Sequence, residues 1–365
     1  MVPYCFPRGE LSNTRRAVSK GFLTVGFLGG SITEARVPHN WPQYVENWFL
    51  LHFPDLRLQV ENLALGATGS DVAMLRMERE VLPCRCDLMF VEYAVNDIGT
   101  DSETRSRSRE GVLRRLLREG NTDVVIVYTF CQDMYPDMEQ NRMPPSIEEF
   151  EQLARYYHLP SVWMGMYALE LVRKGQLKWE EWLPDGLHPQ YAGSRLYGEA
   201  VCRLLESELL SIGSNSERQK GGDALPSPHN VRNWENLERI PFEQMEWASP
   251  FRLFRCQDLK AADQILSTSA PGASVTIPFT GTGLVLGFLF GSDSCEFLCS
   301  VDGSRPVRSN RDRPAWCGKN SWYRTYPAAT DLPYGSHVCC LTVIHGGGEN
   351  CTGTHFELAS ASALK

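Results

Sequence analysis

The stretch FLTVGFLGGSIT, residues 22–33, decides the fold of the first half of the chain. An apolar run from Phe22 to Leu28 ends in two glycines and a serine, Ser31. The run has the length and composition of a buried strand, and the glycines permit a tight turn at its carboxyl end. Sites in open α/β sheets form at the carboxyl ends of parallel strands. Taken alone, such a turn is also compatible with a serine that only caps a helix, so partners from other strands are needed.

Three further strand-like runs follow the first one. They cover Leu58 to Leu63, Leu88 to Tyr93 and Val124 to Thr129, and their composition predicts buried central strands. Apolar residues at spacings of three and four between and after these runs predict helices. The helical segments are Trp41 to His52, Asp71 to Leu82, Arg107 to Glu119, Ile147 to Tyr157 and Tyr191 to Leu209. This alternation predicts an α/β fold with a parallel sheet.

Polar and glycine residues stand at the predicted strand ends. Gly66 follows the second strand and presents an unobstructed N–H, and Asn96 follows the third with an amide that can donate to an oxyanion. Asp185 and His188 are three residues apart, just before a predicted helix. Asp185 can orient the imidazole while His188 takes a proton from Ser31. Each feature alone has a simpler explanation, such as a helix cap or a surface histidine.

Four short motifs thus follow one another along the chain, around Ser31, Gly66, Asn96 and the pair Asp185 and His188. In this order they resemble the motifs of the SGNH hydrolases, also called GDSL-type esterases, over about Gly21 to Leu209. The resemblance implies a three-layer α/β/α, flavodoxin-like domain. It also implies a catalytic triad of Ser31, Asp185 and His188, with an oxyanion hole from the N–H groups of Ser31 and Gly66 and the Asn96 amide. No metal or other cofactor is implied. The chain departs from the family in having a glycine for the aspartate of Gly-Asp-Ser, and an alanine two places before Asn96.

The amino-acid composition of the chain changes after Leu210. Ser211 to Asn230 is rich in Ser, Gly, Asn and Pro, as exposed linkers are. Short strands separated by turn residues then predict an all-β sandwich with a hairpin turn at Asp302-Gly303. Its clearest strands are Ser274 to Phe279, Gly283 to Phe290, Glu296 to Val301 and His337 to Ile344. We therefore expect a hydrolase domain over 1–212, a linker over 213–241, and over 242–365 a jelly-roll like a carbohydrate-binding module.

Composition excludes several classes of partner. The 365 residues are 42% hydrophobic and 22% charged, which is typical of globular domains rather than disordered or fibrous chains. The net charge of −8 argues against nucleic acid and anionic membranes as partners. No apolar stretch reaches the roughly 20 residues that span a bilayer, so we expect a cytoplasmic protein with reduced thiols. Cys84 and Cys86 have no matching pair at zinc-site spacing, which favours structural thiols over a metal site.

The two-domain order resembles carbohydrate esterases, most of all carbohydrate esterase family 17, whose members remove O-acetyl groups from mannooligosaccharides. The resemblance implies an acetylated oligosaccharide as substrate. Five aromatic side chains are candidates for stacking on sugar rings or, alternatively, for packing: Trp41, Trp182, Trp316, Trp322 and Tyr323. An acetylxylan-type or lipidic short-chain esterase, a thioesterase and a catalytically silent carbohydrate-binding protein stay open. A sandwich that serves as the interface of a homo-oligomer also stays open.

Overall fold

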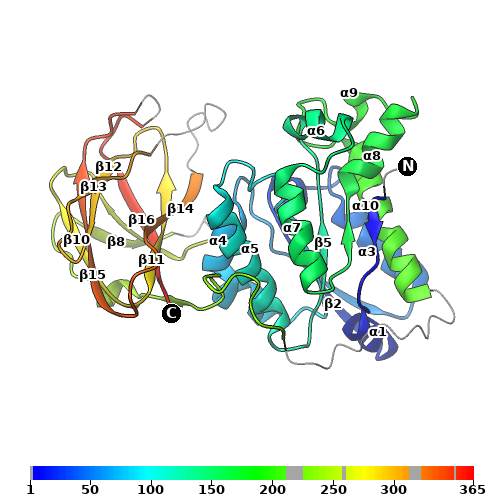
Figure 1. The fold of residues 1–365 in the computed structure, drawn as a ribbon, viewed down its shortest axis with the longest axis horizontal. Helices are drawn as coiled ribbons and strands as arrows, with labels where there is room; N and C mark the ends of the chain where they lie inside the picture. The colour runs from blue at the N-terminus through cyan, green and yellow to red at the C-terminus, as the bar shows by residue number, and fades with distance from the viewer. Residues whose placement is uncertain (1–2, 211–224, 257–259, 312–321, 349–350) are drawn as a thin grey trace. The chain divides into compact units, whose positions relative to one another are not determined.

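The computed structural model describes residues 3–210, 225–256, 260–311, 322–348 and 351–365 (Figure 1). The chain divides into two compact units. The first contains Met1–Ala73 and Met77–Glu235, and the second contains Asn236–Lys365 with Met74–Arg76.

A six-stranded sheet forms the centre of the first unit. Its strands lie in the order β1 (Cys5–Phe6), β6 (Ser161–Val162), β5 (Asp123–Val127), β4 (Leu88–Val91), β2 (Phe22–Leu28) and β3 (Arg57–Asn62). All neighbouring strands are parallel except β1, which runs antiparallel to β6. The predicted parallel α/β fold is therefore confirmed. The expectation that Leu58 to Leu63 is central was wrong, because β3 is the edge strand and its residues are half-buried or exposed.

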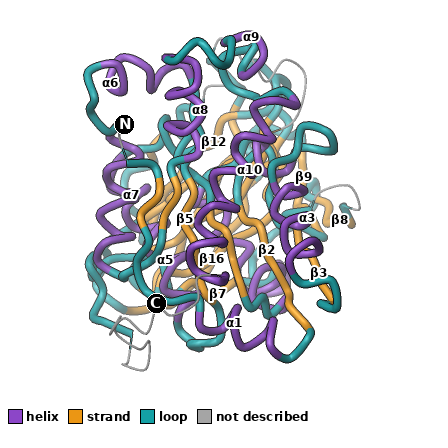
Figure 2. Tube along the Cα trace, turned by 90° about the vertical axis from the view of Figure 1, so that its right-hand side faces the viewer, coloured by secondary structure: helices purple, strands orange, loops and turns teal. Residues whose placement is uncertain are grey.

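Helices cover both faces of this sheet. They are α1 (Ser12–Ser19), α2 (Ser31–Glu34), α3 (Pro42–His52), α4 (Ser70–Arg76), α5 (Ser102–Leu117), α6 (Tyr135–Glu139), α7 (Pro145–Tyr156), α8 (Met164–Arg173), α9 (Trp179–Trp182) and α10 (Tyr191–Leu205). Helices α5 and α7 pack together on one side of the strands, and α10 packs against α3 and α8 on the other (Figures 1 and 2). This is the expected three-layer arrangement. The predicted helix over Asp71 to Leu82 is shorter, because α4 gives way to a π-helical turn at Met77.

Part of the expected linker belongs to the first unit. Arg114 of α5 donates to the carbonyl oxygen of Pro226 at 2.7 Å and to Glu235 Oε1 at 2.7 Å. Glu110, on the same helix, accepts the backbone N–H of Asn230 at 2.7 Å. Residues 225–235 are therefore packed on α5, and the two compact units divide after Glu235.

A buried ion pair ties α5 to the loop that follows β4. Arg109 Nε donates to Asp97 Oδ2 at 2.7 Å, and each side chain is 1% exposed. The same guanidinium donates to the carbonyl oxygen of Ser146, at the start of α7, at 2.6 Å. Asp97 also accepts the N–H and the hydroxyl of Ser70 at 2.9 and 2.8 Å. One buried pair thus connects α4, α5, α7 and the loop that carries Asn96.

Replacing Arg109 by methionine is expected to lower the free energy of unfolding by about 3–5 kcal/mol, because Asp97 is left buried without its cation. Urea unfolding followed by circular dichroism measures the loss. The matched control is Arg155→Met, which breaks an exposed pair with Glu148 and should cost no more than about 1 kcal/mol. An equal loss in the two variants would contradict this account of the pair.

Two antiparallel sheets form the second unit. One has the order β10 (Ser274–Gly281), β15 (Gly335–Ile344), β12 (Glu296–Val301) and β13 (Val307–Arg308). The other has the order β14 (Trp322–Ala329), β11 (Gly283–Phe290), β16 (Phe356–Leu364), β9 (Gln264–Thr268) and β8 (Arg252–Arg255), and β7 (Leu237–Arg239) also pairs with β16. Asp302 and Gly303 have φ values of +52° and +69°, so the predicted hairpin turn has left-handed residues at both positions.

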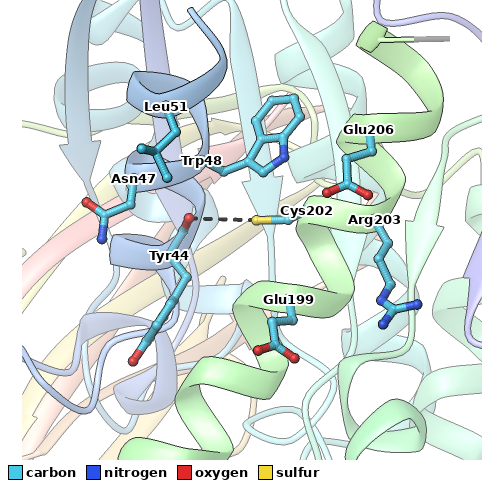
Figure 3. A pocket seen from close by; sticks show the side chains of 8 residues that line it. All are labelled: Tyr44, Asn47, Trp48, Leu51, Glu199, Cys202, Arg203 and Glu206. Carbon is cyan, nitrogen blue, oxygen red and sulfur yellow. Dashed lines mark hydrogen bonds between the residues drawn. The ribbon is translucent and has the colours of Figure 1, made fainter. Parts of the chain in front are cut away.

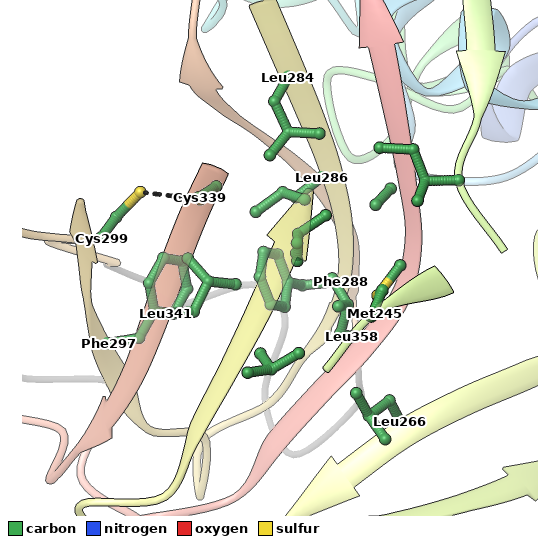
Figure 4. Close-up of a cluster of buried hydrophobic side chains, with 14 of the residues drawn as sticks. Met245, Leu266, Leu284, Leu286, Phe288, Phe297, Cys299, Cys339, Leu341 and Leu358 are labelled. Carbon is green, nitrogen blue, oxygen red and sulfur yellow. Dashed lines mark hydrogen bonds between the residues drawn. The ribbon is translucent and has the colours of Figure 1, made fainter. Parts of the chain in front are cut away.

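The core of the second unit lies between these sheets. Leu341 and Phe297 from the first sheet meet Leu286, Phe288 and Leu358 from the second (Figure 4). This packing of two inner faces makes a β-sandwich and confirms the expected all-β class. The described cysteines of both units are all free thiols. None of the described helices is long and apolar enough to cross a membrane.

Candidate active site

Ser31, His188 and Asp185 form one chain of hydrogen bonds. Ser31 begins α2, after the two-glycine turn that ends β2, and its Oγ lies 2.9 Å from His188 Nε2. The other ring nitrogen, Nδ1, lies 2.8 Å from Asp185 Oδ2. A proton can pass from Ser31 Oγ to Nε2 while Asp185 accepts the Nδ1–H and fixes the tautomer. The fold therefore brings together the three residues that the sequence predicted as a triad.

Backbone N–H groups of the loop before α10 hold the Asp185 carboxylate in place. Its Oδ1 accepts the backbone N–H groups of Leu187 and His188 at 2.9 and 2.7 Å. Partial burial acts to raise the pKa of Asp185, but the bonds from the His188 ring and these two amides outweigh it and hold the pKa below 3.8. Gly186, with φ at +77°, turns the chain between Asp185 and Leu187. Asp185 is therefore ionised at neutral pH.

Asn96 lies directly against the turn that carries the nucleophile. A Cβ atom added to Gly30 would lie 2.0 Å from Asn96 Oδ1 and 2.8 Å from Nδ2. A side chain at position 30 would therefore force the Asn96 amide out of the place that it has in this structure. The predicted donor Asn96 is thus beside the residue that precedes Ser31.

A buried carboxylate under the turn was missed by sequence reasoning. Glu92 is fully buried and accepts the hydroxyl groups of Thr129 at 2.7 Å and Thr33 at 3.3 Å. Burial raises the pKa of Glu92 above its ordinary value, although the hydroxyl bonds and the Gly30 N–H act against this. Glu92 thus links β4 to the residues on either side of Ser31. The sequence feature that could have identified Glu92 is a carboxylate within the apolar, strand-like run from Leu88 to Tyr93.

Gly66 lies beside Ser31, and its N–H already has a partner. A Cβ added to Gly66 would lie 3.6 Å from Ser31 Cβ. The Gly66 N–H donates to Glu34 Oε2 at 2.7 Å. Sequence reasoning selected Gly66 but missed Glu34, which stands three residues after Ser31.

Trp41 and Trp182, expected at the rim of the site, are both fully buried. Trp41 packs its edge against Phe27 with ring centroids 5.3 Å apart, and Trp182 stacks on Phe130 at 4.8 Å. Neither ring offers a face to a sugar, so the expectation of substrate contact is corrected to core packing for both. The physical reason is the large apolar area that an indole removes from water.

The two described aromatic candidates of the second unit, Trp322 and Tyr323, differ in burial. Tyr323 is buried, with its hydroxyl 2.9 Å from Ser360 Oγ, so its ring is part of the sheet packing. Trp322 is half-buried, and the guanidinium of Arg324 lies over its ring at 4.0 Å. Trp316 lies outside the described residues. Trp322 is thus the one described candidate of this unit that is not buried.

The triad is open to solvent. The side chains of His188 and Asp185 are 47% and 53% exposed. A separate groove of about 660 Å³ lies between α3 and α10, with Tyr44 and Trp48 on one side and Glu199 and Arg203 on the other (Figure 3). It contains no triad residue. Among the described residues, no group of three or more His, Cys, Asp or Glu side chains could hold a metal ion.

Residues 27–196 match the model of the GDSL-like lipase/acylhydrolase family. The matched range contains Ser31, Gly66, Asn96, Asp185 and His188. The first unit is therefore a domain of this family, and the protein is a carboxylic ester hydrolase.

Two solved structures share the fold over the whole chain. A crystal structure of a two-domain esterase (CEX) active on acetylated mannans, co-crystallized with mannopentaose, has a TM-score of 0.82 and 20% sequence identity, over 99% of this chain and 96% of that one. A second crystal structure of a two-domain esterase (CEX) active on acetylated mannans has a TM-score of 0.83 and 20% identity, over 99% and 97%. This likeness shows the two-domain fold. No curated protein matches the chain.

Proposed function

We propose that the protein is a serine esterase that removes O-acetyl groups from acetylated oligosaccharides, with acetylated mannooligosaccharides as the preferred class. The observation that carries this proposal is the hydrogen-bonded chain from Ser31 through His188 to Asp185. Its position at the carboxyl end of β2, beside Gly66 and Asn96, supports acyl transfer.

The reaction proceeds in two halves. Ser31 Oγ attacks the acetyl carbonyl carbon while His188 Nε2 takes the hydroxyl proton. The oxyanion is held by the N–H groups of Ser31 and Gly66 and by Asn96 Nδ2. The C–O bond to the sugar then breaks, and the sugar oxygen receives the proton from His188, which leaves an acetyl-enzyme. Water attacks this ester with His188 again as base, and acetate leaves as Ser31 regains its proton.

Two features support a saccharide as the alcohol part. The exposed triad can reach an acetyl group that projects from a bulky chain, since the ester need not enter a deep cavity. The shared two-domain fold with an esterase active on acetylated mannans favours mannan-derived fragments over other glycans.

Acetate release from three substrates tests the proposal: acetylated mannooligosaccharides, acetylated xylooligosaccharides and a short-chain aryl acetate. The Ser31→Ala variant serves as the blank. We expect the wild type to have its highest kcat/KM on the mannooligosaccharides. A preference for xylooligosaccharides would transfer the assignment to acetylxylan, and turnover of the aryl ester alone would remove the carbohydrate assignment. Sugar binding without any turnover would contradict the esterase proposal.

A further inference from the structure

The carboxylate of Glu34 accepts a hydrogen bond from the Gly66 N–H, which the proposed reaction needs for the oxyanion. Ser31 and Glu34 are the first and last residues of α2, and at this spacing two side chains lie on the same face of a helix. Glu34 Oε2 accepts the Gly66 N–H at 2.7 Å. A Cβ on Gly66 would lie 2.8 Å from this oxygen and 3.6 Å from Ser31 Cβ. The carboxylate therefore takes the N–H of the second predicted oxyanion donor, at a point where that residue lies beside the nucleophile.

The oxyanion and this carboxylate cannot use the Gly66 N–H together. Both are anions, both need the same donor, and like charges at hydrogen-bonding distance repel strongly where water is displaced. One of the two partners in the Glu34–Gly66 bond must therefore move before the tetrahedral intermediate forms.

The backbone around Gly66 is the fixed partner. The N–H of Leu65 donates to the carbonyl oxygen of Gly29 at 2.9 Å, which ties the loop to the nucleophile turn. The hydroxyl of Thr68 donates to the carbonyl oxygen of Leu65 at 2.8 Å. The Glu34 side chain has three rotatable bonds and starts from a helix of a single turn. The side chain is therefore the part that moves.

We propose that Glu34 is a substrate-displaced plug of the oxyanion hole, and that it selects esters whose alcohol part carries hydroxyl groups. A carboxylate accepts hydrogen bonds from hydroxyl donors on a sugar ring, which offset the loss of the Gly66 N–H. An ester without neighbouring hydroxyl groups offers Glu34 no replacement hydrogen bond, so the carboxylate stays on the Gly66 N–H and the oxyanion hole stays blocked. Binding energy from the sugar is thereby used to assemble the site. This inference rests on the proposed esterase function and adds a determinant of specificity to it.

Glu34→Ala and Glu34→Gln test the plug with two substrates, p-nitrophenyl acetate and acetylated mannooligosaccharides. Without the charge, kcat/KM for p-nitrophenyl acetate is expected to rise about tenfold, since an oxyanion donor is typically worth about 10²–10³-fold and only part of that is withheld. KM for the oligosaccharides is expected to rise by at least about tenfold, the loss of a hydrogen bond to a charged group. The Gln variant keeps an oxygen that can accept the Gly66 N–H and so preserves the fold, but this neutral oxygen is a weaker acceptor and does not repel the oxyanion, so it is displaced more easily than the carboxylate. The control is Glu148→Ala on α7, with no change expected for either substrate.

Labelling of Ser31 by a fluorophosphonate gives a readout that does not depend on turnover. The phosphonyl oxygen needs the oxyanion hole, so the Glu34 variants should be labelled faster than the wild type. If the wild type cleaves neither ester, the proposed function fails while the labelling rates still decide the plug. Equal losses on both esters, or labelling rates that do not change, would overturn the plug. Equal losses would show that Glu34 supports the reaction directly instead.

Discussion

Asp185→Asn is expected to lower kcat about 10⁴-fold and to leave the fold intact. Asp185 Oδ2 accepts the Nδ1–H of His188, which leaves Nε2 free to take the Ser31 proton. An asparagine can present its amide N–H₂ to Nδ1 and so stabilise the wrong tautomer. Its oxygen still accepts the backbone N–H groups of Leu187 and His188, so the loop keeps its shape.

A second His–Asp pair in the chain supplies the control for this variant. His337 Nδ1 lies 2.7 Å from Asp302 Oδ2, and Asp302 Oδ1 accepts the Val338 N–H at 2.9 Å. The pair repeats the bonds between His188 and Asp185, but its Nε2 lies 2.9 Å from the carbonyl oxygen of Pro333 instead of a serine. Asp302→Asn should therefore leave kcat unchanged. Unaltered kcat in Asp185→Asn as well would refute the orienting role.

The lowered pKa of Asp185 determines at which pH the wild type loses the stability that this carboxylate contributes. The pKa of the folded protein lies below the ordinary 3.8, so the stability that the ionised carboxylate contributes is complete above that value. It is lost only as the pH falls through the lower, folded pKa. Asp185 therefore stays ionised between about pH 5 and 9 and contributes no acid limb to kcat/KM of the wild type in this range. A limb of the wild-type profile in this range that vanishes in the Asp185→Asn variant would contradict this.

Local patterns predicted which candidate residues the fold brings together, because Ser31 follows a recognisable strand and two glycines, and Asp185 and His188 share one short loop that contains Gly186. The strand from Phe22 to Leu28 ends where predicted, and it delivers Ser31 to the sheet edge. The bounds of Gly283–Phe290 and Glu296–Val301 were also predicted, since turn residues flank both strands. Strong local signals of this kind do not depend on the rest of the fold.

Features that depend on tertiary neighbours were missed. The apolar run at Leu58 indicates a strand but not that it lies at the sheet edge, because strand order is not written in the run itself. The indole of Trp41 could lie at a rim or in the core, and only the position of Phe27 decides between them. The Glu34–Gly66 bond joins residues 32 positions apart through a side chain whose direction no periodicity predicts.

The two-residue strands Cys5–Phe6 and Ser161–Val162 gave no pattern at all. Each is too short for a period of two residues to be visible. Their place in the sheet comes from pairing with each other and, for Ser161–Val162, with the neighbouring Asp123–Val127.

Asn96→Ala is expected to lower kcat about 10²–10³-fold with little change in KM, because in the proposed mechanism Nδ2 meets the oxyanion only in the transition state. Steady-state kinetics on the best ester measures both constants. Asn47→Ala, on α3, is the matched control and should stay within about twofold, as it lines the separate groove. A loss confined to KM would mean that Asn96 binds the substrate rather than the transition state.

Gly30→Ala gives an independent route to the same loss. Its Cβ would meet Asn96 Oδ1 at 2.0 Å, so the amide must leave its position. If the amide acts on the oxyanion, Gly30→Ala should reproduce most of the effect of Asn96→Ala, and the double variant should be no slower than the slower single one. Two variants whose losses multiply would act through separate interactions. Non-additivity would therefore show that the glycine at position 30 is needed to make room for the Asn96 amide beside Ser31.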